Sequence, residues 1–170
     1  FCVDANQAWE TTAESIEWIN WLKDRGCLFV EQPMPVSKAN EFEHLFRASS
    51  LPLILDESLQ GLTELEELKG VCHGINVKLL KCGGIEPAVT LVRQANKLGL
   101  KVLVGCMSES SCGAMAAAQL SAWADWVDLD GPMLISNDPF SGATYRNGSL
   151  LLSEQSGTGA ILKDNDLFSN

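Results

Sequence analysis

A repeat of short apolar runs, each ending in a polar residue or a glycine, constrains the fold of this chain most strongly. The last residues of these runs lie 22 to 27 residues apart, at Asp4, Glu31, Asp56, Lys78, Gly105 and Asp128. A period of this length accommodates one strand, a loop, one helix and a second loop. The repeat therefore predicts six βα units whose strands form a parallel sheet.

Helix-forming segments lie between the apolar runs. Apolar residues at helical spacing predict helices at about 12–25, 39–48, 62–68, 87–98 and 111–124. Thr11 or Thr12 is the expected N-cap of the first helix, and Gly26 ends it. Beyond the last strand the chain is rich in turn residues, and a hairpin is expected around Asn147–Gly148.

Two parallel architectures fit this pattern. An open doubly wound sheet usually carries a glycine-rich turn after its first strand, whereas residues 4–9 read DANQAW. A (β/α)8 TIM barrel places active-site residues at the carboxyl ends of several strands, which matches five of the six strand ends here. A complete barrel needs about 250 residues and eight strands. We therefore predict an α/β fold in which residues 1–170 are the C-terminal portion of one catalytic barrel domain, about strands 3 to 8.

Composition narrows the partners and the compartment. A formal net charge of −10 disfavours nucleic acids and anionic membranes. No apolar run reaches the roughly 18 residues of a membrane span, and FCVDANQAWE lacks the features of a signal peptide. The six cysteines form no CxxC pair and lie mostly in apolar segments, as in a reducing compartment. These features predict a cytoplasmic protein with neither a nucleic-acid nor a membrane partner.

The charged strand ends suggest a metal site with a base beside it. Asp4, Glu31 and Asp56 offer the hard oxygens that Mg²⁺ prefers, although each acid alone would read as a solvated loop charge or a helix cap. Asn76 and Lys78 are two residues apart on one strand, so they face the same way. A nearby cation and burial would both lower the pKa of a lysine, as a general base near neutral pH requires.

The segments that carry these residues resemble a known family. DANQAW, VEQPMP, LDES, NVKLLKCGGI and GCMSESS are similar to the barrel motifs of the enolase superfamily, in its muconate-lactonising branch. The resemblance covers nearly the whole chain and implies that Asp4, Glu31 and Asp56 bind Mg²⁺. It implies that Lys78 is one acid/base of a reaction through an enediolate. A second lysine base, in a Lys-x-Lys pair, and a capping domain would then lie N-terminal to Phe1.

Two features place the chain within the superfamily. The mandelate-racemase branch would show a histidine base near the seventh barrel strand, but His44 lies in a predicted helix and His73 precedes a strand. We expect both histidines to be structural or surface residues. The segment VDLDGP resembles the DxD motif of dipeptide epimerases, in which two carboxylates, here Asp128 and Asp130, receive the substrate's ammonium group. An N-terminal turn motif in the loop after the strand is the alternative interpretation of that segment.

The loop after the fifth apolar run completes the expected mouth of the barrel. Cys106, Met107 and Ser108 resemble positions that line the dipeptide site, whereas the sequence assigns no role to Glu109. The helix that begins near Ser111 is expected to point its N-terminus into the mouth and to favour an anionic group. Lys81 is expected to leave its strand and to carry no chemistry.

The predicted function is that of a Mg²⁺-dependent isomerase, a dipeptide epimerase that removes the proton next to a carboxylate. The expected partner is a small-molecule dipeptide, and a homo-oligomer is compatible with the resemblance because many such barrels associate. The alternatives are a muconate cycloisomerase, an o-succinylbenzoate synthase or an N-acylamino acid racemase of the same branch, or a non-catalytic barrel fragment. DLDG as a phosphatase nucleophile is disfavoured, because that motif belongs near the start of a doubly wound sheet.

Overall fold

The computed structural model describes residues 1–163, and it contains one six-stranded parallel sheet. The strands lie side by side in the order of the sequence, without a reversal. Their bounds are Val3–Asp4 (β1), Val30–Glu31 (β2), Leu53–Leu55 (β3), Gly74–Lys78 (β4), Lys101–Gly105 (β5) and Trp126–Asp128 (β6). This sequential order is that of a barrel, since a doubly wound sheet reverses its strand order at a switch point.

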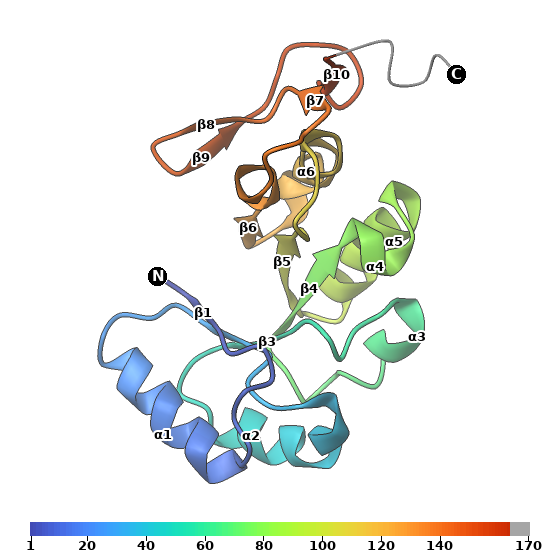
Figure 1. The fold of residues 1–170 in the computed structure, drawn as a ribbon. Helices are drawn as coiled ribbons and strands as arrows, with labels where there is room; N and C mark the ends of the chain where they lie inside the picture. The colour runs from blue at the N-terminus through green and yellow to red at the C-terminus, as the bar shows by residue number, and fades with distance from the viewer. Residues whose placement is uncertain (164–170) are drawn as a thin grey trace.

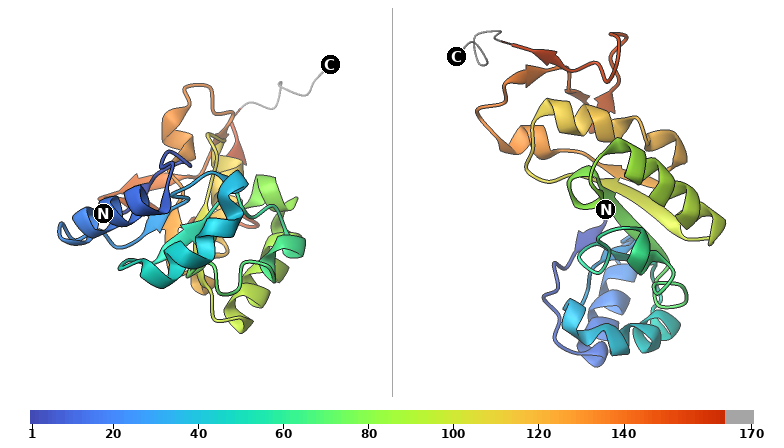
Figure 2. Two further views of the ribbon diagram at one scale, coloured as in Figure 1. Left: turned by 90° about the horizontal axis from the view of Figure 1, so that it is seen from below. Right: turned by 90° about the vertical axis from the view of Figure 1, so that its right-hand side faces the viewer.

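Helices connect the strands and follow one another round the outside of the sheet (Figures 1 and 2). They are α1 (Thr12–Lys23), α2 (Phe42–Ala48), α3 (Leu62–Leu65), α4 (Leu79–Cys82), α5 (Ile85–Lys97) and α6 (Ser111–Ala118), with 3-10 segments η1 (Val36–Glu41) and η2 (Ser121–Trp123). The expected N-cap of α1 is confirmed, because Thr11 Oγ1 accepts a hydrogen bond from the backbone N–H of Glu14 at 3.2 Å.

Two apolar clusters lie on opposite faces of the sheet. Leu53 and Leu55 pack into the large cluster beneath the helices, whereas Ile54 between them belongs to the small one. The small cluster also contains Phe29 and Leu103, with Trp126 packed against it. The rings of Phe29 and Trp126 are only 4.6 Å apart between centroids, although one precedes β2 and the other begins β6. The sheet therefore curves far enough for distant strands to share an interior, and it forms part of a barrel.

The segment after β6 begins with a 3-10 turn, η3 (Gly131–Leu134), and then forms two small antiparallel pairs. The expected hairpin is present, with β8 (Thr144–Arg146) paired to β9 (Ser149–Leu151). Its turn residues Asn147 and Gly148 have φ of 51° and 77°, the left-handed conformation that such a two-residue turn requires. The pairing of β7 (Phe140–Ser141) with β10 (Ile161–Leu162) was not anticipated from the sequence pattern.

Several helices differ from the prediction. The helix α3 ends at Leu65 and not at about residue 68, and the segment predicted as one helix at 39–48 is divided between η1 and α2. The helix α6 ends at Ala118, not near Ala124, because the chain turns into η2. The one-turn helix α4 was not predicted, because the pair of glycines after it reads as a turn. No helix within residues 1–163 combines the length and the apolar character that a membrane crossing requires.

Candidate active site

The strand register brings the expected site residues to one edge of the sheet. Asp4 on β1 lies opposite Glu31 on β2. Farther along the strand order, Lys78 on β4 lies opposite Gly105 on β5, and Gly105 lies opposite Asp128 on β6. All five residues are the last of their strands, so the carboxyl edge of this part of the barrel gathers the charged groups.

Asp56, one residue beyond β3, is held between two lysine ammonium groups. Lys78 Nζ donates to Oδ2 of Asp56 at 2.7 Å. Lys81 Nζ donates to Oδ1, and it also donates to the main-chain carbonyl of Asp56 at 2.7 Å. Lys81 lies beyond β4, in α4, as expected, but it has contacts with Asp56 that the sequence did not predict. From α4, the Lys81 side chain reaches back toward the ends of β3 and β4.

Gln32 fixes the loop that carries Asp56, although no local sequence pattern marks it as a site residue. The side chain is fully buried, and its carbonyl oxygen accepts from the backbone N–H of Asp56 at 3.0 Å and of Ser58 at 3.3 Å. Its amide nitrogen donates to Met34 O and to the Ser58 hydroxyl. A buried amide with its donors and acceptor satisfied ties the end of β2 to the end of β3. The backbone φ of Gln32 is 30°, a conformation that a residue other than glycine rarely adopts unless the surrounding structure holds it.

Asn76 positions Glu31. It lies on β4 two residues before Lys78, is 3% exposed, and donates through Nδ2 to Oε1 of Glu31 at 2.7 Å. Gly105 on β5 approaches the Asn76 side chain closely, and a Cβ added there would come within 2.5 Å of it. Glycine at this point of β5 therefore leaves room for an amide that orients a carboxylate.

We expect Gly105→Ala to displace Asn76 and to release Glu31. Overpacking of this kind costs about 1–3 kcal/mol of stability. Loss of a residue that orients a metal ligand typically lowers metal affinity about 10- to 100-fold. Urea unfolding and Mg²⁺ titration calorimetry measure the two effects. Gly61→Ala is the matched control, because a Cβ there meets only one atom, at 4.0 Å; equal behaviour of the two variants would contradict the role of Asn76.

Burial and mutual repulsion of the carboxylates raise two of their pKa values. Burial, opposed by the Asn76 hydrogen bond and reinforced by Asp4 and Asp56, raises the pKa of Glu31 to about 7. The pKa of Asp4 is raised by burial and by the charges of Glu57 and Asp56. Repulsion of this kind is what a dication relieves.

Lys78 departs from the expectation of a lowered pKa. Burial lowers the pKa of Lys78, but the Asp56 carboxylate beside it and the charges of Glu31 and Asp4 outweigh burial, so the pKa lies above its usual value. The protein's own charges therefore favour the ammonium form. A divalent cation at these carboxylates would oppose their effect on Lys78.

The donor set fits Mg²⁺ in type and number. Asp4, Glu31 and Asp56 supply three carboxylates, and the latter two are only 5% exposed. As the side chains lie, however, no group of three or more His, Cys, Asp and Glu residues in the described part of the chain could hold a metal ion. Both oxygens of Asp56 are directed at Lys78 and Lys81. A cation bound here would therefore share or compete for the Asp56 oxygens with the two ammonium groups.

Mg²⁺ affinity is expected to fall about tenfold between pH 8 and pH 6, because a ligand must be deprotonated to bind and the pKa of Glu31 is about 7. The carboxylate is mostly ionised above that value and mostly protonated below it. Titration calorimetry at the two pH values checks this. An affinity that does not change between them would contradict a Glu31 ligand whose pKa is about 7.

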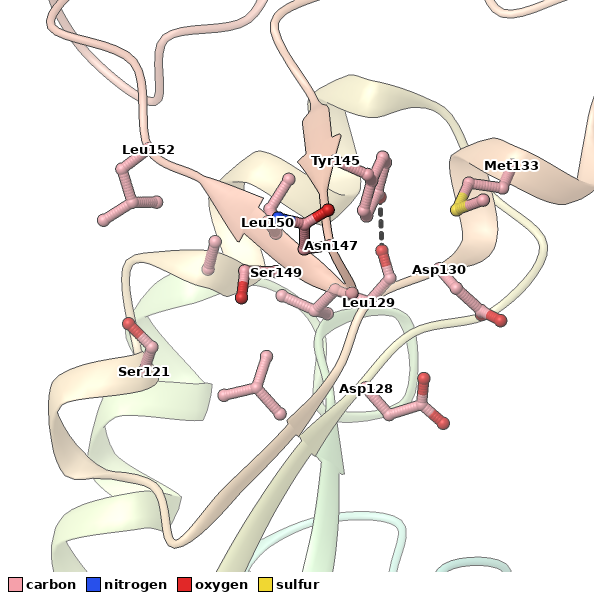
Figure 3. Close-up of a pocket in the computed structure, with 13 residues that line it drawn as sticks. Ser121, Asp128, Leu129, Asp130, Met133, Tyr145, Asn147, Ser149, Leu150 and Leu152 are labelled. Atoms are coloured by element: carbon pink, nitrogen blue, oxygen red, sulfur yellow. Dashed lines mark hydrogen bonds between the residues drawn. The ribbon is translucent and has the colours of Figure 1, made fainter. Parts of the chain in front are cut away.

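Asp128 and Asp130 border a cavity of about 720 Å³ at the end of β6 (Figure 3). Both side chains point to the same side of the strand end, away from Leu150 and Leu152 of the hairpin segment. The pKa of Asp128 is raised by burial and by the charge of Asp130, and Lys78 partly offsets this. The Tyr145 hydroxyl donates to the carbonyl of Leu129 between the two acids and fixes the hairpin to this loop. The two acids do not share a strand face, because β6 ends at Asp128 and Asp130 directly precedes η3; their role in binding an ammonium group stays a prediction.

The loop after β5 packs tightly on the loop after β6. Cys106 Sγ accepts a hydrogen bond from the backbone N–H of Gly131 at 3.3 Å, and burial raises the pKa of the Cys106 thiol to about 11. Met107 and Ser108 are exposed beside it. The carboxylate of Glu109 accepts from the backbone N–H of Met107 at 3.1 Å. Cys106 therefore braces the DxD loop, and Met107 and Ser108 remain free to meet a ligand.

The N-terminus of α6 is occupied from within the protein. Asp138 Oδ2 accepts from both the backbone N–H and the hydroxyl of Ser111, at 2.9 Å and 2.6 Å. Its other oxygen accepts from Phe140 N at 2.9 Å. The expectation that this helix end favours a bound anion is thus corrected, since a carboxylate of the chain already neutralises it.

The remaining candidates have structural positions. His73 Nδ1 accepts from the backbone N–H of Leu53 at 3.0 Å, and its ring lies 4.5 Å from that of Phe46. His44 is exposed on α2. All six cysteines are free thiols. Neither histidine approaches the carboxyl edge of the sheet as a base.

Comparison with known proteins agrees with this arrangement. The L-Ala-D/L-Glu epimerase of Bacteroides thetaiotaomicron is 44% identical over 159 residues, which are 94% of this chain and 42% of that protein. The crystal structure of a dipeptide epimerase from Cytophaga hutchinsonii, complexed with Mg and the dipeptide D-Ala-L-Val, superposes with a TM-score of 0.87 at 27% identity. It is matched over 96% of this chain and 46% of its own length. An N-succinyl Arg/Lys racemase from Bacillus cereus gives a TM-score of 0.86 at 30% identity, over 95% of this chain and 45% of its own.

The chain thus spans less than half the length of these relatives. A family model described as "Enolase C-terminal domain-like" matches residues 1–166, nearly the whole chain. That match agrees with the sequential parallel sheet and with acids and a lysine at its carboxyl edge. This protein belongs to the enolase superfamily, in its muconate-lactonising branch.

Proposed function

We propose that this chain carries the metal ligands and one acid/base of an enzyme that epimerises dipeptides. The observation that carries the proposal is the placement of two functional groups of opposite charge at one edge. The ammonium group of Lys78 and the paired acids Asp128 and Asp130 lie on either side of Gly105, with β5 between them. A substrate whose carboxylate would meet a cation beside Lys78, and whose ammonium group would meet the two acids, matches this arrangement.

Different residues of the chain would bind the metal ion and transfer the proton. Asp4, Glu31 and Asp56 would hold Mg²⁺, which when bound supplies the positive charge that stabilises an enediolate as the proton next to a carboxylate leaves. Lys78 would accept or return that proton through Nζ. A second base on the opposite face of the carbon, which inversion requires, would come from outside this chain.

The DxD loop would select the substrate class. Asp128 and Asp130 are both acidic, and burial and their mutual repulsion raise the pKa of Asp128, so an ammonium group between them would be favoured electrostatically. Muconate and succinylbenzoate precursors are anions and would be repelled here. The N-succinyl Arg/Lys racemase among the similar structures names a second candidate, an N-acylated amino acid with a cationic side chain. Such a substrate would use the same two acids for its side chain.

Solvent deuterium exchange tests the proposal on the complete protein. Incubation in D2O with Mg²⁺ should remove the α-proton signal of a dipeptide from the proton NMR spectrum and should produce its epimer. N-succinyl-lysine and muconate are run in parallel to separate the candidates within the branch. Absence of exchange with every dipeptide of a broad panel would refute a dipeptide epimerase, and exchange confined to N-succinyl-lysine would establish the second candidate.

Asp128→Asn is expected to raise KM for dipeptides about 10- to 100-fold with a smaller change in kcat. The residue would bind the ammonium group and would not touch the reacting carbon, and hydrogen-bonded charge pairs are worth about 1.5–3 kcal/mol. Steady-state kinetics of epimerisation measures the split. Asp24→Asn, an exposed position after α1, is the control. A variant with an unchanged KM would remove Asp128 from the substrate site.

A further inference from the structure

Lys81 differs from Lys78 in how many fixed groups it contacts. Its Nζ has three hydrogens, and three oxygens lie within hydrogen-bond distance. One is Oδ1 of Asp56, the second is the main-chain carbonyl of Asp56 at 2.7 Å, and the third is the main-chain carbonyl of Asn76 at 3.3 Å. The side chain is only 10% exposed. The ammonium group of Lys81 is therefore saturated and enclosed.

Two of these three acceptors belong to the backbone at neighbouring strand ends. The carbonyl of Asp56 lies at the end of β3, where it also accepts from the backbone N–H of Leu59 at 3.0 Å. The carbonyl of Asn76 lies within β4. Asn76 is held by the sheet, and the backbone of Asp56 is held by its hydrogen bonds with Leu59 and with the Gln32 side chain, so neither carbonyl can rotate away as a side chain can. Lys81 thus keeps its place whether or not the Asp56 carboxylate bonds to it.

Lys78 has a different set of contacts. Its Nζ donates to Oδ2 of Asp56 at 2.7 Å, and that side-chain oxygen is its one hydrogen-bond acceptor within residues 1–163. The Lys78 side chain is 13% exposed. Rotation of one carboxylate or one lysine torsion releases it. One carboxylate therefore connects an ammonium group anchored to backbone with an ammonium group that is free to move.

We infer that Lys81 is a positioning residue that holds the Asp56 carboxylate in place from the side opposite Lys78. Lys81 fixes Oδ1 and the backbone of Asp56, so that Oδ2 can pass from Lys78 to a cation without the carboxylate turning away. Lys78 is thereby released for proton transfer while Asp56 stays in position. This inference rests on the proposed function, because it assigns the partner of one proposed metal ligand.

Lys81→Met tests the inference in the complete protein, since methionine keeps much of the length and apolar volume of the lysine stem but has no ammonium group. Calorimetric titration with Mg²⁺ should show affinity weakened about 10- to 100-fold, as expected for loss of a residue that orients a metal ligand. Lys81→Arg should recover part of that loss, because the guanidinium can still donate to the carboxylate. Lys97→Met, at an exposed position in the last turn of α5, is the matched control.

A double-mutant cycle separates positioning through Asp56 from a general structural role. Lys81→Met should weaken Mg²⁺ binding strongly beside native Asp56 but change it less than twofold in an Asp56→Asn background. Equal effects in both backgrounds, or a folded Lys81→Met protein with native Mg²⁺ affinity, would overturn the inference. If Lys81→Met does not fold, Lys81→Arg and Lys81→Gln replace it in the same double-mutant cycle. Native Mg²⁺ affinity in both of these variants would also overturn the inference. A native protein that neither binds Mg²⁺ nor exchanges an α-proton would instead refute the proposed function.

Discussion

Lys78→Ala is expected to lower the rate of dipeptide epimerisation at least about 10³-fold, with little change in KM. A positioned general acid or base contributes about 10²- to 10⁴-fold, and within residues 1–163 Lys81 is the one other lysine paired with Asp56. Lys81 is the nearest alternative, but its three donors are engaged with the carboxylate of Asp56 and two main-chain carbonyls. Stopped-time chiral analysis of the products measures the loss.

The same variant distinguishes a two-base reaction from a one-base reaction. In D2O, the epimer whose proton faces Lys78 should no longer exchange, while the other epimer should still exchange with the base on the opposite face. Loss of exchange from both epimers would show that Lys78 organises the site and does not itself move the proton. Full epimerase activity in the variant would refute the proposed mechanism.

The fold should survive the removal of Lys78. Breaking a buried ion pair by deleting one partner typically costs about 3–5 kcal/mol, because the other charge is left without compensation. Here Asp56 keeps its contacts with Lys81 and with the backbone. We therefore expect a smaller loss of stability, which urea unfolding measures. Lys97→Ala is the control for removal of a lysine from an exposed site.

Asp56→Asn is expected to weaken Mg²⁺ binding at least about 100-fold and to abolish epimerisation. The substitution removes one of three carboxylates from a hard-oxygen site and leaves two lysine ammonium groups facing a neutral amide. The backbone N–H of Asp56 remains bonded to the Gln32 side chain, so the loop keeps its anchor. Calorimetric titration with Mg²⁺ and the D2O exchange assay measure both losses.

The outcome for Asp56→Asn is informative in either direction. Asp24→Asn, at an exposed position after α1, should bind Mg²⁺ as the native protein does. An Asp56→Asn protein that keeps native Mg²⁺ affinity would show that Asp56 serves only as the ionic partner of Lys78 and Lys81. Asp4 and Glu31 would then have to find their third ligand elsewhere.

The strand ends could be predicted because their signal is local. A short apolar run that ends in a charged residue, repeated every 22 to 27 residues, identifies both the strand and the edge at which its last side chain lies. Asp4, Glu31, Lys78 and Asp128 are each the last residue of a strand for this reason. The hairpin at Asn147–Gly148 was likewise predictable, because left-handed backbone is a property of those two residues.

The residues that brace the site had no such signal. Lys81 lies in a one-turn helix that is not visible in any periodicity, and its acceptors lie at 56 and 76. Gln32 reads as a loop residue, yet its side chain bonds to the loop after β3. Asp138 caps a helix that begins 27 positions earlier. Each of these contacts depends on how far the chain turns back in three dimensions.

The sequence alone determined the parallel arrangement of strands and the edge that carries the acids and the lysine. These follow from strand alternation and from the period of the repeat, which act over a few residues. Only the tertiary structure decided that Asp56 lies between two ammonium groups, that Asn76 orients Glu31 past Gly105, and that the α6 N-terminus is already neutralised. Such contacts are set by sheet curvature and chain reversal, because these bring together side chains that no local pattern relates.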